Sequence, residues 1–257
     1  MRCGFPARDL LATRLVSTAT LMSMVSNSHP HSIKRRLISA MAVLSTVGLF
    51  AGCSEAAANH DVTEQGRLAF GCTLAEHIDQ EHGDPQSWSM YIGDNADPGV
   101  REIATVGNIF VAASTTGAVD RDHVGVQAQN LLESVSRIDT EMMGSGLEEI
   151  QAACADLDVG EYPDVSHEGQ LDYACDLTAH LDQEYGSANQ WSDALDGPVV
   201  NLALAAASLT GAYNGQRLAE APELSEASRD LVHSINRVDA EMTDEAMAKF
   251  RSECEAR

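Results

Sequence analysis

The 257-residue sequence is short of basic residues after position 52. Residues 53–257 contain ten Lys and Arg side chains against 38 Asp and Glu, a net charge of −28. Such a surface repels phosphates, which excludes nucleic acid as a partner and leaves cations and basic proteins open. Residues 1–52, in contrast, have a net charge of +5. A break of this kind separates a targeting segment from a folded protein.

The sequence also lacks the motifs of common enzyme mechanisms. There is no GxSxG, no phosphate-binding loop and no dinucleotide fingerprint. HIDQEH at 77–82 is not HExxH, and DLDVG at 156–160 does not have the spacing of a calcium loop. No Ser or Cys is indicated as a nucleophile. We therefore expect no enzymatic activity.

A signal-like segment precedes Cys53. The basic cluster that begins at Lys34 is followed by an apolar run at 37–52, which is too short to span a bilayer comfortably. With Ala51 and Gly52 before Cys53, the segment resembles a bacterial lipoprotein signal peptide, although Phe50 stands where the family usually has an aliphatic residue. The resemblance implies that residues 1–52 are removed and that Cys53 is lipidated, which anchors the protein to the membrane outside the cytoplasm.

Two other fates of this segment are open. Cleavage after Ala58 would give an ordinary secreted protein, and an uncleaved segment would itself be the anchor. Met22 or Met24 would each start a well-proportioned signal peptide, so residues 1–21 need not be translated. The small, polar residues 53–66 are expected to form a tether.

The remaining sequence is internally repeated. Residues 70–88 align without gaps on residues 173–191, with eight of 19 positions identical. Residues 112–118 match 206–212, residues 131–142 match 231–242, and Cys154 matches Cys254. We interpret these blocks as two tandem repeats, 67–155 and 171–257, joined by an acidic linker at 156–170.

Each repeat is predicted to be a bundle of about four helices, so that the fold is all-α. Apolar residues recur at helical spacing, and no stretch alternates as a strand does. A third helix is expected to carry a stripe of Leu131, Val135, Ile138 and Met142. The fourth helix is expected to begin at Ser145 in one repeat and at Thr243 in the other.

Four cysteines besides Cys53 follow the signal-like segment, and outside the cytoplasm they should be oxidised. In an up-down-up-down unit the start of the first helix and the end of the last lie at the same end. This geometry favours Cys72–Cys154 and Cys175–Cys254 among the three possible pairings.

Some polar residues are common to both copies. Asp139 and Asp239 fall within the apolar stripe of the third helix, so they are predicted to be buried and to need partners. The expected partners are His77 or Arg137 for the first carboxylate and His180 or Arg237 for the second. Trp88 and Trp191 are expected to anchor the end of the first helix of each copy.

These polar clusters allow two hypotheses. A satisfied network would fix the register of the helices. Alternatively, they would bind a divalent cation or haem, with ligands in two sets: His77, Glu81 and Asp139; His180, Glu184 and Asp239. We expect no cofactor and a binding or structural role at the cell envelope. Two similar units on one tether would suit bivalent contact with a protein partner.

Overall fold

The computed structural model describes residues 60–88, 98–191, 197–211 and 219–257. The predicted signal peptide, Cys53 and most of the tether lie outside the described residues. All regular secondary structure in the described residues is helical, which confirms the all-α prediction. None of these helices has the length and apolar character needed to cross a membrane.

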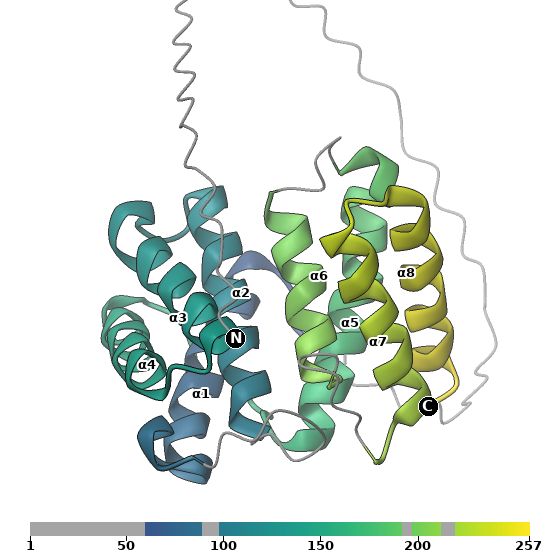
Figure 1. Ribbon diagram of the computed structural model, residues 1–257. Coiled ribbons are helices and arrows are strands. Elements are labelled where there is room, and N and C mark those ends of the chain that lie inside the picture. The colour runs from purple at the N-terminus through teal and green to yellow at the C-terminus, as the bar shows by residue number, and fades with distance from the viewer. Residues whose placement is uncertain (1–59, 89–97, 192–196, 212–218) are drawn as a thin grey trace, which may run out of the picture. The chain divides into compact units, whose positions relative to one another are not determined.

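The first half contains four α-helices: α1 (Glu64–His82), α2 (Pro98–Thr116), α3 (Val126–Arg137) and α4 (Thr140–Asp156). The second half follows the same order: α5 (His167–Tyr185), α6 (Pro198–Leu209), α7 (Pro222–Asn236) and α8 (Ala240–Glu255). Short 3₁₀ turns follow α1 and α5 at η1 (Pro85–Ser87) and η3 (Ala188–Gln190), and a π-helical turn, η2 (Arg121–Gly125), precedes α3 (Figure 1).

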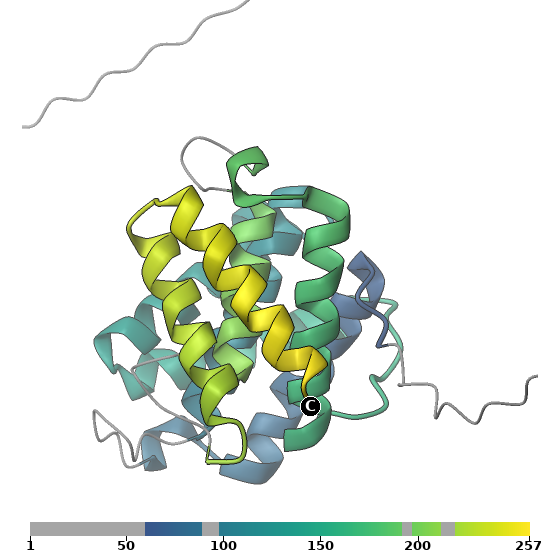
Figure 2. The same ribbon diagram turned by 90° about the vertical axis from the view of Figure 1, so that its right-hand side faces the viewer.

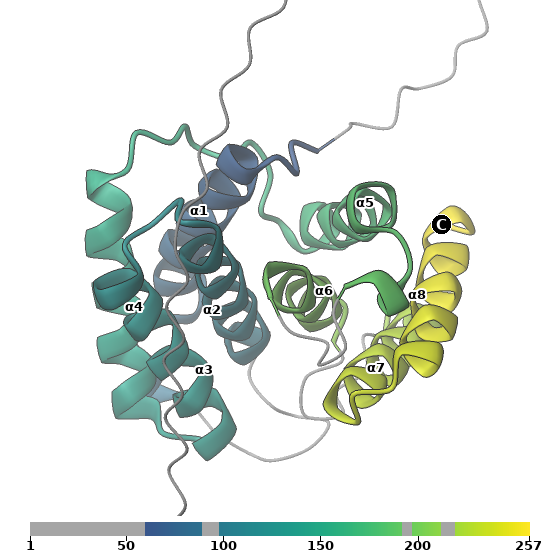
Figure 3. The same ribbon diagram turned by 90° about the horizontal axis from the view of Figure 1, so that it is seen from above.

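α2 and α6 pack against each other at the centre of the described residues, which all belong to one compact unit (Figure 3). α6 consists mostly of small and apolar residues, and nine of its twelve residues are buried. α3 and α4 lie outside α2, while α7 and α8 lie outside α6 (Figures 2 and 3). The two halves therefore share one continuous core.

α1 and α5 begin with the same local structure. Thr63 caps α1 by accepting a hydrogen bond from the Gly66 amide, and its own amide donates to Asp61. Ser166, Gly169 and Asp164 make the same contacts at the start of α5. The internal match thus extends to DVTEQG and DVSHEG, and both helices begin earlier than the expected ends of the tether (66) and the linker (170).

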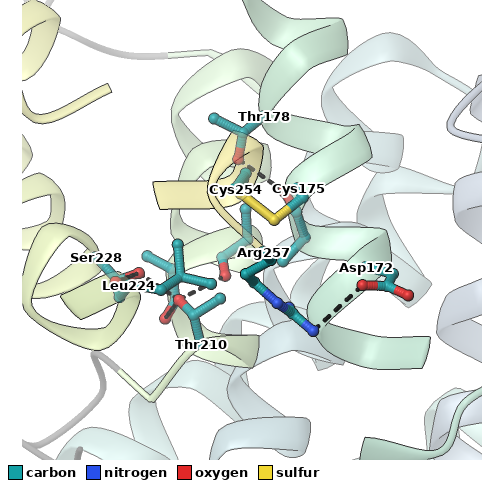
Figure 4. The surroundings of a disulfide bond; sticks show 11 residues. Asp172, Cys175, Thr178, Thr210, Leu224, Ser228, Cys254 and Arg257 are labelled. Carbon is teal, nitrogen blue, oxygen red and sulfur yellow. Dashed lines mark hydrogen bonds and ion pairs between the residues drawn. A yellow bond between two sulfur atoms is a disulfide. The ribbon is translucent and has the colours of Figure 1, made fainter. Parts of the chain in front are cut away.

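The disulfides join the predicted cysteines. Cys72 bonds to Cys154 and Cys175 to Cys254, closing loops with sequence separations of 82 and 79 residues. Each bridge ties the first helix of its half to the last. Beside the second bridge, Arg257 pairs with Asp172 at 3.3 Å (Figure 4).

The prediction for the third and fourth helices was wrong in both halves. α3 ends at Arg137, because Ile138 adopts a left-handed conformation at φ 58°, and α4 already begins at Thr140. Val238 adopts the same left-handed conformation, at φ 54°, between α7 and α8. Ile138 and Met142 therefore do not continue one stripe, and neither Ser145 nor Thr243 starts a helix.

Candidate functional site

The predicted polar clusters around Asp139 and Asp239 do not form. Asp139 is exposed and caps α4, where its Oδ1 accepts a hydrogen bond from the Met142 amide at 3.0 Å. Asp239 caps α8 through the Met242 amide at the same distance. The prediction that these carboxylates are buried was wrong, because the turn before each one ends the preceding helix. Their common role is to start the last helix.

The side chains expected to accompany these aspartates lie elsewhere. Arg137 forms an ion pair with Glu133 on its own helix. His77 is half-buried on α1, whereas Glu81 and Glu184 are exposed. Within the described ranges no three His, Cys, Asp or Glu side chains gather into a group that could hold a metal ion. Neither predicted ligand set is therefore assembled.

His180 faces the other half of the molecule. Its Nε2 lies 3.4 Å from Nη1 of Arg67, which also donates to the carbonyl of Val62 at 2.6 Å. Burial lowers the pKa of His180, and the adjacent guanidinium lowers it further, although Glu184 acts in the opposite direction. Because a guanidinium has no acceptor, Nε2 of His180 accepts this hydrogen bond between α1 and α5.

The two tryptophans anchor the ends of the first helices, as the sequence predicts. The indole of Trp88 donates to the carbonyl of His82 at 2.9 Å, and that of Trp191 donates to the carbonyl of Gly186 at 3.2 Å. Gly99 allows the first contact, because a Cβ there would stand 2.6 Å from the Trp88 ring.

A buried polar network that the sequence analysis did not identify connects α1, α2 and α5. Glu102 is only 4% exposed, and its Oε2 lies 3.1 Å from Nε2 of His82. Its Oε1 accepts from the amide of Gln170 at 2.7 Å, and that amide also donates to the carbonyl of Val165 at 2.9 Å. We call His82, Glu102 and Gln170 the junction network, since it holds the two halves together.

The neighbouring Arg101 adds a second contact between the halves. Its guanidinium is buried and donates to the carbonyl of Leu209, the last residue of α6, at 3.3 Å. Burial lowers the pKa of Arg101, while the charge of Glu102 raises it. The α2–α6 contact therefore includes a cation at the carbonyl end of a helix, where cations are favoured.

Comparison between the two copies could not have found this network. The alignment places Tyr185 opposite His82 and Arg67 opposite Gln170, and the match of 112–118 on 206–212 places Asp196 opposite Glu102. A search for polar residues that are identical in both copies therefore discards all three. The signal in the sequence was the pair of charges, Arg101 and Glu102, at the start of a helix that is otherwise uncharged.

An aromatic cluster joins α1, α5 and the linker between the halves. The rings of Phe70 and Tyr173 stack with centroids 3.6 Å apart, and Tyr162 meets both edge-on. His60 bonds to the Tyr162 hydroxyl through Nδ1 at 3.0 Å, and its amide donates to Asp176 at 2.9 Å. The chain entering α1 is thus fixed on the linker between the halves, where a tether was expected.

These arrangements are mostly architectural. The imidazole and carboxylate of the junction network could orient one another, as in an acid–base pair, but both side chains are occupied in joining helices. No family model, no curated protein and no solved structure matches the chain.

Proposed function

We propose that this chain is a lipid-anchored protein outside the bacterial cytoplasm, with a binding or structural role at the cell envelope and no enzymatic activity. The observation that carries the proposal is that the polar and aromatic residues common to both halves stabilise helix ends. Asp139 and Asp239 cap the last helices, and Trp88 and Trp191 hold the ends of the first ones. Similarity between the halves therefore preserves a scaffold rather than a reactive group.

We also propose that the two halves arose by duplication of one helical unit that contains one disulfide. Its support is the same order of helices in both halves, one disulfide in each half, and the matching starts of α1 and α5, where an aspartate accepts from the amide of the capping residue. Phe70 also stacks on Tyr173, its partner in the alignment, as two copies related by an approximate twofold axis would require.

Two further features support the proposed location outside the cytoplasm. The disulfides fit an oxidising compartment. In this proposal the basic and apolar segment before Cys53 is the export signal, and Cys53 is the lipid acceptor. A net charge of −28 after that point suits a soluble body held near, but not adsorbed on, an anionic membrane.

The test is the mass of the protein extracted from bacterial membranes. We expect a chain that begins at Cys53 and carries diacylglycerol, and a Cys53→Ser variant that is absent from the membrane fraction. A soluble wild-type product beginning at Asn59 would instead establish ordinary secretion.

A further inference from the structure

The first helix is connected to the second half at both of its ends, and a histidine takes part in each connection. At the start of α1, the guanidinium of Arg67 bonds to His180 of α5. At the last residue of α1, His82 bonds to Glu102 of α2, and that carboxylate also accepts from Gln170 of α5. Histidine is the side chain whose ordinary charge change falls in the range of about pH 5 to 8. Both connections are therefore sensitive to protons in that range.

At the start of α1, a proton on His180 opposes the contact. The ring accepts from Arg67 at 3.4 Å, whereas a protonated ring has no acceptor and would bring two positive charges together. Burial lowers the pKa of His180, Arg67 lowers it further, and Glu184 raises it by less. Among the helices that pack on α5, α6 has no titratable side chain, and Arg251 of α8 is paired with Asp182 at 3.0 Å. Acid should therefore break this contact.

At the end of α1, a proton on His82 favours the contact. Glu102 is buried and lies 3.1 Å from Nε2 of His82, so protonation turns a neutral hydrogen bond into an ion pair, which is stronger. A charge on His77 would oppose this, but its ring centre is 6.4 Å from that of His82, and the nearer carboxylate outweighs it. Arg101 bonds to the last carbonyl of α6, and the contact from α5 is the uncharged Gln170. Acid should therefore strengthen this contact.

We propose that α1 is a pH-sensitive link between the halves, in which acidification releases its start from α5 and holds its end more firmly on Glu102. The two imidazoles act in opposite directions because one faces a guanidinium and the other a carboxylate. The pH of the surroundings thus decides which end of α1 is held. This regulation goes beyond the role proposed above and does not depend on lipidation of Cys53.

The test is amide hydrogen exchange of the full chain, read by mass spectrometry at about pH 5.5 and about pH 7.5. Protection factors are compared, because they remove the intrinsic effect of pH on exchange. On acidification, we expect protection to fall in the first turns of α1 and to rise in its last turn, each by at least about threefold. The last turn of α3 is the reference for changes that affect the whole molecule. Changes of the same sign at both ends of α1, relative to that reference, would overturn the proposal.

Single substitutions assign each change to its imidazole. His180→Gln should abolish the fall in protection at the start of α1 and leave the rise at its end, and His82→Gln should do the reverse. Glutamine keeps a hydrogen-bonding group at each position, so neither variant leaves a buried partner unpaired. His233→Gln, which replaces an exposed imidazole on α7, should keep both changes. Wild-type behaviour of both His180→Gln and His82→Gln would also overturn the proposal.

Discussion

The hydroxyl of Tyr173 is a buried polar atom without a hydrogen-bond partner among the described residues. Its match in the first half is Phe70, which has no hydroxyl to satisfy. Because an unpaired buried hydroxyl costs free energy, Tyr173→Phe should raise the free energy of unfolding by about 1 kcal/mol. Tyr162→Phe is the matched control, and it should lower stability by about 1 kcal/mol, since that hydroxyl bonds to His60. Both are measured by urea unfolding, and a loss of stability in Tyr173→Phe would contradict the assignment.

His180 makes stability depend on pH. Because burial and Arg67 lower its pKa in the folded state, the unfolded chain binds more protons below about pH 6.5. Its contribution is therefore present above that pH and is lost as the pH falls through the folded pKa. His180→Gln should flatten this part of the stability profile, measured by urea unfolding between pH 5 and 8. His233→Gln, which replaces an exposed imidazole on α7, should leave the wild-type slope. Equal slopes in all three would refute the idea.

At the scale of single elements, the starts of α1 and α5 depend on glycine. A Cβ at Gly66 would lie 2.2 Å from the Asp61 carbonyl oxygen, and one at Gly169 would lie 2.5 Å from the Asp164 carboxyl carbon. Gly66→Ala and Gly169→Ala should therefore each lower the free energy of unfolding by about 1–3 kcal/mol, although alanine normally favours a helix.

Gly160→Ala is the control for these substitutions, since a Cβ at that position would meet no described atom within 4 Å. There alanine restricts the unfolded chain and should stabilise the protein by about 0.5 kcal/mol. Thermal unfolding of the three variants distinguishes crowding from propensity. Stabilisation by Gly66→Ala would show that the close approach of Asp61 to the start of α1 is not needed.

The elements also show where sequence reasoning succeeds. Helical periodicity predicts the all-α fold and about four helices in each half, and bundle geometry predicts both disulfides. The helix ends were missed because β-branched Ile138 and Val238 rarely adopt left-handed backbone. Without that turn, the helical pattern puts Asp139 within an apolar stripe rather than at the start of a helix. The junction network was missed because it depends on contacts between the halves.

At the scale of the whole molecule, the α2–α6 core decides how the protein unfolds. Two independent bundles would each unfold at their own midpoint. Here α2 and α6 bury their small apolar faces against each other, and Arg101 and Glu102 bond across to the second half. Neither half could lose its structure without exposing the central face of the other, so unfolding is expected to be cooperative.

The disulfides provide the means to test this cooperativity. Each bridge closes a loop of about 80 residues, so its removal should lower the free energy of unfolding by up to about 4 kcal/mol. In the double substitution Cys72→Ser with Cys154→Ser, we expect one calorimetric transition at a lower midpoint. The double substitution Cys175→Ser with Cys254→Ser is its symmetric counterpart and should behave alike. Two separate transitions in either variant would mean that the halves are independent domains and that their shared core contributes little to stability.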